Sequence, residues 1–156
     1  MAYIARTQDD PNELGRSADQ QESVLNDEYF YHCIRYLCIE VVDKDTLLTT
    51  GGGKKAFHIP PEVSGMNLVY VHAFNLTPSA VGIPTFQIAN VTDATVMLST
   101  KLTIDATETG SNTAAVPAVI DTTKDDVVTN DILAVNVDVA GSTTKGVYIT
   151  VGFGFP

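Results

Sequence analysis

The chain has 156 residues and a formal net charge of −10, with 44% apolar and 18% charged residues. This length suits one domain with a core of its own. The acidic balance disfavours sequence-independent nucleic-acid binding, which needs clustered Lys and Arg, and it equally disfavours attraction to anionic membranes. Val and Thr are abundant and Trp is absent, which indicates a β-rich protein.

The N-terminus does not read as a secretory signal, because no basic segment precedes a long apolar core. No apolar run approaches the ~20 residues that span a bilayer. Cys33 and Cys38 would face opposite sides of one strand, with their Cα atoms roughly 16 Å apart, beyond the ~7 Å limit for a disulfide. We therefore expect free, buried thiols and synthesis in a reducing cytoplasm.

Residues 1–28 differ in composition from the rest of the chain, because seven acidic residues accompany only two arginines, a net charge of −5. Ser17 and Gln20 can form a capping box that opens one or two helical turns. Two interpretations stay open, a frayed terminus and an extended arm that becomes ordered against a neighbouring subunit. The arm residues expected to bind a partner are Tyr3, Ile4, Arg6, Asp9, Asp10, Glu13 and Arg16.

A sandwich domain is expected over residues 29–156. Its first apolar run predicts a strand from about Cys33 to Val42, followed by a polar turn over residues 43–50. The aromatic residues that begin the run most often pack at a sheet end, and the alternative is stacking on a sugar.

Residues 51–55, Gly-Gly-Gly-Lys-Lys, suggest a phosphate-binding loop but do not fit its pattern. Leu48 stands where the first glycine belongs, and Lys55 stands where Ser or Thr is needed. The segment therefore predicts a flexible hairpin connection, followed by a short strand over residues 56–59.

Residues 67–76 are apolar on both faces of a strand, which predicts a strand central in its sheet or covered by a partner subunit. His58 and His72 fall on strands that follow one another along the chain. Two histidines can begin a metal site, but no third ligand stands at a suitable spacing. We expect core or interface histidines and no metal.

The stretch from Gly82 to Ile104 shows the strand pattern most clearly. Residues 85–91 alternate, with Phe86, Ile88 and Asn90 on one side, and a polar turn over residues 90–94 leads to two short apolar pieces. A strand, a corner and further strand pieces at this spacing are typical of a β-sandwich.

The C-terminal third predicts a loop over residues 105–113, a short edge strand over 114–120 and an aspartate-rich loop over 121–131 that lacks the spacing of a calcium loop. Two alternating strands follow, and we expect residues 141–146 to join them as a hairpin. Their inward residues are Leu133, Val135, Val137, Val139, Val147, Ile149, Val151 and Phe153.

These patterns predict an all-β protein, a jelly-roll-like antiparallel β-sandwich with an extended N-terminal arm. Six residues are expected to be buried together at its centre: Phe86, Ile88, Val135, Val137, Ile149 and Val151.

Three segments, residues 48–73, 82–108 and 118–141, resemble a family of small β-sandwich virion proteins of tailed bacteriophages. The resemblance rests on Gly-x-Pro-Thr-x-Gln-Ile-x-Asn-Val-Thr-Asp at residues 82–93, on Met-Leu-Ser-Thr and on a C-terminal Asp-Val-Ala-Gly. It covers roughly residues 47–153 and leaves the arm outside.

The resemblance implies a non-enzymatic structural protein of the virion, made in the host cytoplasm. The expected role is capsid decoration, with attachment through the arm and self-association, expected as a trimer, and with the major capsid protein or other virion proteins as partners. The alternative is a receptor- or carbohydrate-binding module of a tail fibre or tail attachment protein. No catalytic residue and no cofactor are expected, and the chain has no Gly-x-Ser-x-Gly motif of a hydrolase.

Overall fold

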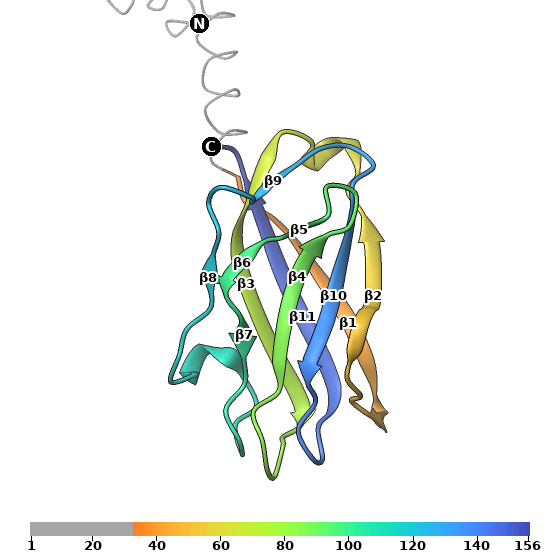
Figure 1. Cartoon of the computed structure of the whole chain (residues 1–156), viewed down its shortest axis with the longest axis vertical. Helices are drawn as coiled ribbons and strands as arrows, with labels where there is room; N and C mark the ends of the chain where they lie inside the picture. The colour runs from red at the N-terminus through yellow and green to blue at the C-terminus, as the bar shows by residue number, and fades with distance from the viewer. Residues whose placement is uncertain (1–32) are drawn as a thin grey trace, which may run out of the picture. The chain divides into compact units, whose positions relative to one another are not determined.

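The computed structural model describes residues 33–156, and residues 34–156 form one compact unit (Figure 1). The predictions for the arm lie outside the described residues. They comprise the partner-binding residues from Tyr3 to Arg16, the capping box and the domain boundary after residue 28.

Two antiparallel sheets make up this unit. Sheet A has the order β1 (Arg35–Leu47), β11 (Lys145–Gly154), β3 (Met66–Thr77) and β9 (Asp126–Val127). Sheet B has the order β2 (Gly51–His58), β10 (Ile132–Val139), β4 (Thr85–Asn90) and β5 (Thr95–Val96), and β7 (Leu102–Thr103) also pairs with β4. The shorter elements are the strand pair β6 (Leu98–Thr100) and β8 (Val119–Ile120) and the 3₁₀ turns η1 (Pro61–Val63) and η2 (Ser111–Thr113).

The strand order is that of a jelly roll. Successive long strands change sheets: β1 and β3 lie in sheet A, whereas β2 and β4 lie in sheet B, and β10 and β11 again lie in opposite sheets. Eight strands therefore lie four in each sheet, as in a double Greek key, and β7 is an additional strand of sheet B. The predicted all-β sandwich fold is confirmed.

The predicted C-terminal hairpin is wrong. Strand β10 pairs with β2 and β4, whereas β11 pairs with β1 and β3, so residues 140–144 cross from one sheet to the other. Alternation reports which side of a strand is buried but not which strand lies beside it. Two successive strands with matching inward faces can pack across a core as well as side by side.

The core lies between the sheets, and the six residues expected at its centre are all buried together. Val139, also expected to be inward, is 44% exposed. The register between β10 and β4 shifts between Val137 and Val139, and such a bulge turns the following side chain to the other face.

The segment from residue 43 to residue 55 also differs from the prediction. Strand β1 continues to Leu47, and its pairing with β11 shifts register between Val42 and Leu47. The predicted polar turn is therefore a bulge within β1. The glycine-rich residues are not a hairpin loop but the first half of β2, where the Gly53 N–H donates to the side chain of Asn136. The predicted edge strand over residues 114–120 is reduced to the two residues of β8.

The predicted strand over residues 67–76 is confirmed as β3, in the interior of sheet A, but one of its faces is open. Val69, Tyr70 and Leu76 are 44%, 40% and 54% exposed. Of the predicted core or interface positions, the core is wrong for both histidines, because His58 is exposed in sheet B and His72 is half-buried in sheet A, and an interface position stays a prediction. Both cysteines are free, as predicted, but Cys38 is exposed and Cys33 half-buried.

Candidate interaction surface

The first part of the sequence motif Gln-Ile-x-Asn-Val-Thr-Asp is buried, whereas its last three residues are exposed in the turn after β4. Gln87 is buried, and its side-chain amide takes the place of a neighbouring strand. Its Nε2 donates to the Leu98 carbonyl at 2.9 Å, and its Oε1 accepts from the Leu98 N–H at 3.1 Å. The side chain thereby joins β4 to β6, where backbone pairing does not reach.

Asn90, from the same motif, holds the turn after β4. Its Oδ1 accepts from the N–H groups of Thr92 and Asp93, which is an Asx turn. Its Nδ2 donates to the carboxylates of Asp93 and Asp131 at 2.8 and 3.1 Å. Gln87 and Asn90 therefore stabilise a corner of the sandwich.

The Asp-Val-Ala-Gly motif leads into a second corner, where residues 78–81 contact residues 141–144 through hydroxyl groups. Ser79 Oγ accepts from the Ser142 N–H, and Thr143 Oγ1 accepts from the Ala80 N–H. Gly141 has φ +72°, and a Cβ there would lie 2.3 Å from Ser79 Oγ. Only glycine fits this position. This motif, too, is explained by folding.

Three of the four aspartates in residues 121–131 accept structural hydrogen bonds: Asp121, Asp125 and Asp131. Asp131 accepts from the Val128 N–H at 2.9 Å, and Asp125 accepts from the Asn67 amide at 3.1 Å. Hydrogen bonds from Thr123 hold the pKa of Asp121 below its ordinary value. Within residues 33–156, no three His, Cys, Asp or Glu side chains come together as a metal site would require.

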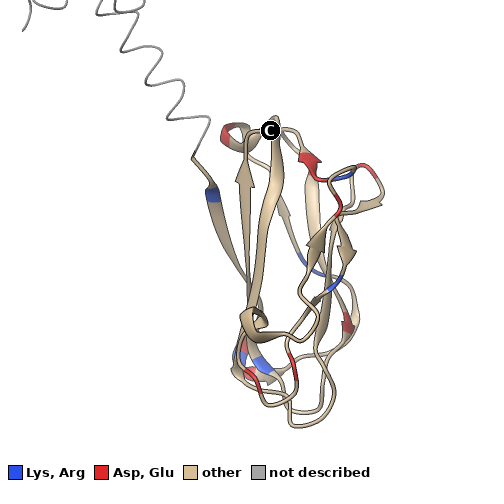
Figure 2. Cartoon of the chain, turned by 90° about the vertical axis from the view of Figure 1, so that its left-hand side faces the viewer, with Lys and Arg blue, Asp and Glu red and all other residues tan. Residues whose placement is uncertain are grey.

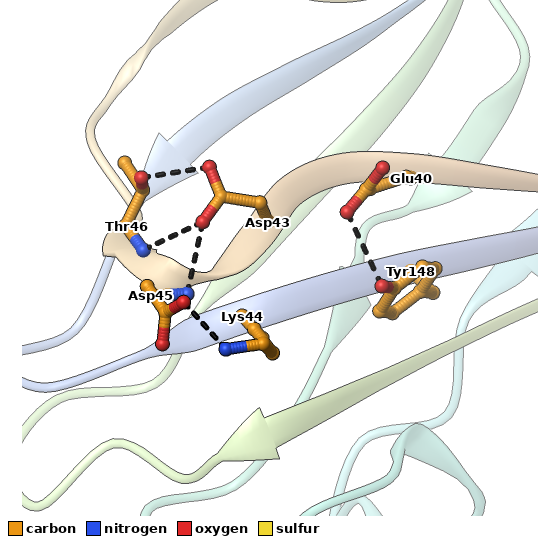
Figure 3. Close-up of polar contacts among 6 residues, drawn as sticks. All are labelled: Glu40, Asp43, Lys44, Asp45, Thr46 and Tyr148. Atoms are coloured by element: carbon orange, nitrogen blue, oxygen red, sulfur yellow. Dashed lines mark hydrogen bonds and ion pairs between the residues drawn. The ribbon is translucent and has the colours of Figure 1, made fainter.

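Hydrogen bonds within residues 43–46 stabilise a local turn near the C-terminal end of β1 (Figure 3). The Asp43 carboxylate accepts from the Thr46 hydroxyl at 2.7 Å and from the N–H groups of Asp45 and Thr46. These bonds, the hydroxyl first, stabilise the charged form and lower the pKa of Asp43.

The outer face of sheet A is the distinctive surface of the described chain. Three rows of outward side chains cross β1, β11 and β3, paired by the register of the sheet. We call this surface the aromatic face, and its rows are Tyr36, Gly152 and Tyr70, then Cys38, Thr150 and His72, then Glu40, Tyr148 and Phe74.

The aromatic rings of this face pack against one another across the strands. Tyr36 and Tyr70 meet edge to face, with ring centroids 5.5 Å apart and planes at 84°. Tyr70 and His72 lie nearly parallel at 6.4 Å, and Phe74 stacks on Tyr148 at 5.0 Å. Such pairs fix the rings in place, which leaves a preorganised apolar surface.

Gly152 allows the two tyrosines of the first row to approach. A Cβ at this position would lie 2.9 Å from Tyr36 Cε1 and 3.0 Å from both Tyr70 Cβ and Ile34 Cγ2. The three side chains therefore cover the glycine backbone. Tyr36 nevertheless remains 56% exposed and Ile34 41% exposed.

The third row contains the polar contact of the face. The Tyr148 hydroxyl donates to the Glu40 carboxylate at 3.2 Å (Figure 3). Partial desolvation, followed by this hydrogen bond and the negative charge of Glu40, raises the pKa of Tyr148 above 10.0. The phenol therefore stays a neutral donor over the physiological range.

Charge is sparse on this face, although residues 33–156 hold twelve acidic and seven basic residues. Glu40 is the acidic residue in the three rows, and no Lys or Arg belongs to them. Figure 2 shows charged residues mainly at the loops and strand ends, with long uncharged stretches of strand between them.

A scan against protein-family models finds no match for the chain, and a search of curated proteins finds no significant match. No helix within residues 33–156 is long and apolar enough to cross a membrane.

Sequence reasoning predicted that the arm binds a partner and did not predict the aromatic face. The alternation along β3 and β11 does place Tyr70, Phe74 and Tyr148 opposite the core residues. It does not show that β11 lies between β1 and β3, which is what brings Tyr36 and Tyr70 together.

Proposed function

We propose that this chain is a non-enzymatic structural protein of a tailed-phage virion, a decoration protein that binds the assembled capsid and stabilises it. The observation that carries the proposal is the broad, weakly charged aromatic face on a jelly-roll domain. A rigid sandwich with one exposed apolar face is suited to binding another protein surface. The sequence resemblance supplies the virion as the setting.

The stabilising mechanism requires only binding. A protein that binds the assembled shell, and not its free subunits, shifts the equilibrium toward the shell by mass action. The N-terminal arm supplies attachment in this proposal, through Tyr3, Ile4, Arg6, Asp9, Asp10, Glu13 and Arg16. Self-association, expected as a trimer, would multiply the attachment strength of each arm without new contacts.

Exposed tyrosines also favour a second candidate, a glycan- or receptor-binding module of the tail. Tyr36 and Tyr70 are 56% and 40% exposed, and tyrosine rings stack on sugars. Their planes stand at 84° to each other, however, so the two rings cannot stack together on one flat sugar chain. We therefore rank this candidate second.

Binding to particles tests the proposal. Particles of the encoding phage that lack this protein are mixed with the purified full chain, and the bound fraction is measured by co-sedimentation. We expect saturable binding to capsids and a higher temperature of capsid disruption. A chain that binds isolated tails but not capsids supports the second candidate, and a chain that binds neither refutes both.

Deleting residues 1–28 separates the arm from the sandwich. We expect the truncated protein to keep its circular dichroism spectrum and melting temperature and to bind capsids at least about tenfold more weakly. Capsid binding of unchanged strength would place attachment on the sandwich and would reduce the arm to a frayed terminus.

A further inference from the structure

We propose that the aromatic face of sheet A is the surface through which this chain binds a second copy of itself. The inference rests on the self-association in the proposed function and assigns it to particular residues. It does not depend on where the protein sits in a virion.

The ring geometry favours a protein partner over a small ligand. Phe74 and Tyr148 turn their ring faces toward each other, and Tyr36 meets Tyr70 edge to face. The rings therefore present edges and ridges, which fit between the side chains of another packed surface. Aromatic residues of this kind are enriched at the centres of protein interfaces.

The size of the face suits a weak association between folded domains. The three rows cover residues 148–152 of β11, about 16 Å along the strand, and three strands span about 14 Å. Their projected area is roughly 230 Å² on each copy, and the whole outer face of sheet A, over the 10 residues of β11, has roughly 460 Å². Two copies that meet over the whole outer face would bury about 900 Å², which is the size of a weak or transient interface.

The low charge of the aromatic face favours a second copy of this acidic chain over a basic partner. Each chain carries a net charge of −10, so two copies repel one another over most approaches. The aromatic face avoids this cost, since Glu40 is the acidic side chain in its rows and is already paired with Tyr148. A surface selected for a basic partner would instead carry exposed carboxylates.

A charge placed on the face tests the inference. Tyr36→Glu adds a carboxylate to the aromatic face, at a side chain that is 56% exposed. The control, Val91→Glu, adds a carboxylate at a side chain that is 53% exposed, in the turn after β4 of sheet B. Association of the full chain is measured by sedimentation velocity from about 1 µM to about 100 µM. We expect the wild type and Val91→Glu to associate equally, and Tyr36→Glu to associate about 30-fold more weakly.

Three results would overturn the inference: a wild type that stays monomeric, a Tyr36→Glu variant that associates like the wild type, or a Val91→Glu variant that dissociates equally. A dimer and a trimer both support it. Circular dichroism shows whether the Tyr36→Glu variant is folded.

Cys38 provides a measurement that leaves the aromatic side chains unchanged. It is exposed in the middle row of the face, so a thiol reagent reports whether the face is covered. Replacing Cys33 by Ser leaves Cys38 as the single thiol. We expect labelling at least about tenfold slower at about 100 µM than at about 1 µM, because association covers the face.

Equal labelling rates at the two concentrations overturn the inference. Fast labelling at both leaves the face open to a different protein, and slow labelling at both assigns the face to a segment of the same chain. Failure here leaves capsid binding by the monomer intact, and failure to bind particles leaves this association intact.

Discussion

The buried side chain of Gln87 gives the sharpest test of how the sandwich is held together. In Gln87→Met the volume is nearly kept, but the bonds to Leu98 are lost. The Leu98 N–H and carbonyl, which bond the amide at 3.1 and 2.9 Å, are then left without partners beside a side chain that is 2% exposed.

The expected loss follows from these two groups. Each buried backbone group without a partner costs about 1–3 kcal/mol, so the variant should lose about 2–6 kcal/mol of unfolding free energy. For a domain of this size the unfolding entropy is roughly 260 cal/mol/K, which converts the loss to a melting temperature lower by about 8–23 °C.

Thermal melts followed by circular dichroism measure the shift, with urea titration as the second measure of free energy. Val91→Met is the control, because it introduces the same residue at an exposed position and should change stability by less than about 0.5 kcal/mol. A loss below about 1 kcal/mol in Gln87→Met would refute the view that this amide replaces a strand.

Three further predictions concern the core, a corner and the aromatic face. Val137→Asp should abolish soluble folding, since Val137 is 2% exposed and the substitution would bury an unpaired carboxylate in the core. A soluble, folded variant would mean that this face of β10 does not need to be buried. Gly141→Ala should lower the unfolding free energy by about 2 kcal/mol or more, because the φ of residue 141 is +72° and the added Cβ would collide with Ser79. An unchanged urea midpoint would contradict the prediction that only glycine fits this position. Tyr148 should ionise above pH 10.0, since partial desolvation and Glu40 raise its pKa, so its contribution to stability is present below that pH and is lost as the pH rises through the folded pKa. An ultraviolet difference titration against Tyr148→Phe measures this midpoint, which Glu40→Gln should lower toward 10.0.

The sequence was sufficient for the fold class and for the core, because both follow from local alternation. Phe86, Val135 and Ile149 alternate with polar or small residues, and burial of one face needs no knowledge of the neighbouring strand. The pairing of strands was not accessible in this way. The glycine-serine-threonine connection after β10 fits a hairpin and a crossing between sheets equally well.

The aromatic face was missed for a related reason. Its three rows combine strands that are about 30 to 110 residues apart in sequence, and only the order of sheet A brings them together. The motifs that attracted attention instead, around Gln87, Asn90 and Gly141, are explained by folding. A motif that carries a sequence resemblance can therefore serve folding without marking a functional site.

The proposed virion role is tested most directly by a cryo-electron microscopy reconstruction of particles that contain this chain. The account predicts jelly-roll density on the outer capsid surface, with neighbouring copies in contact through the aromatic face of sheet A. Particles in which this density is missing from the capsid, or in which the aromatic face points into solvent on isolated copies, would contradict it.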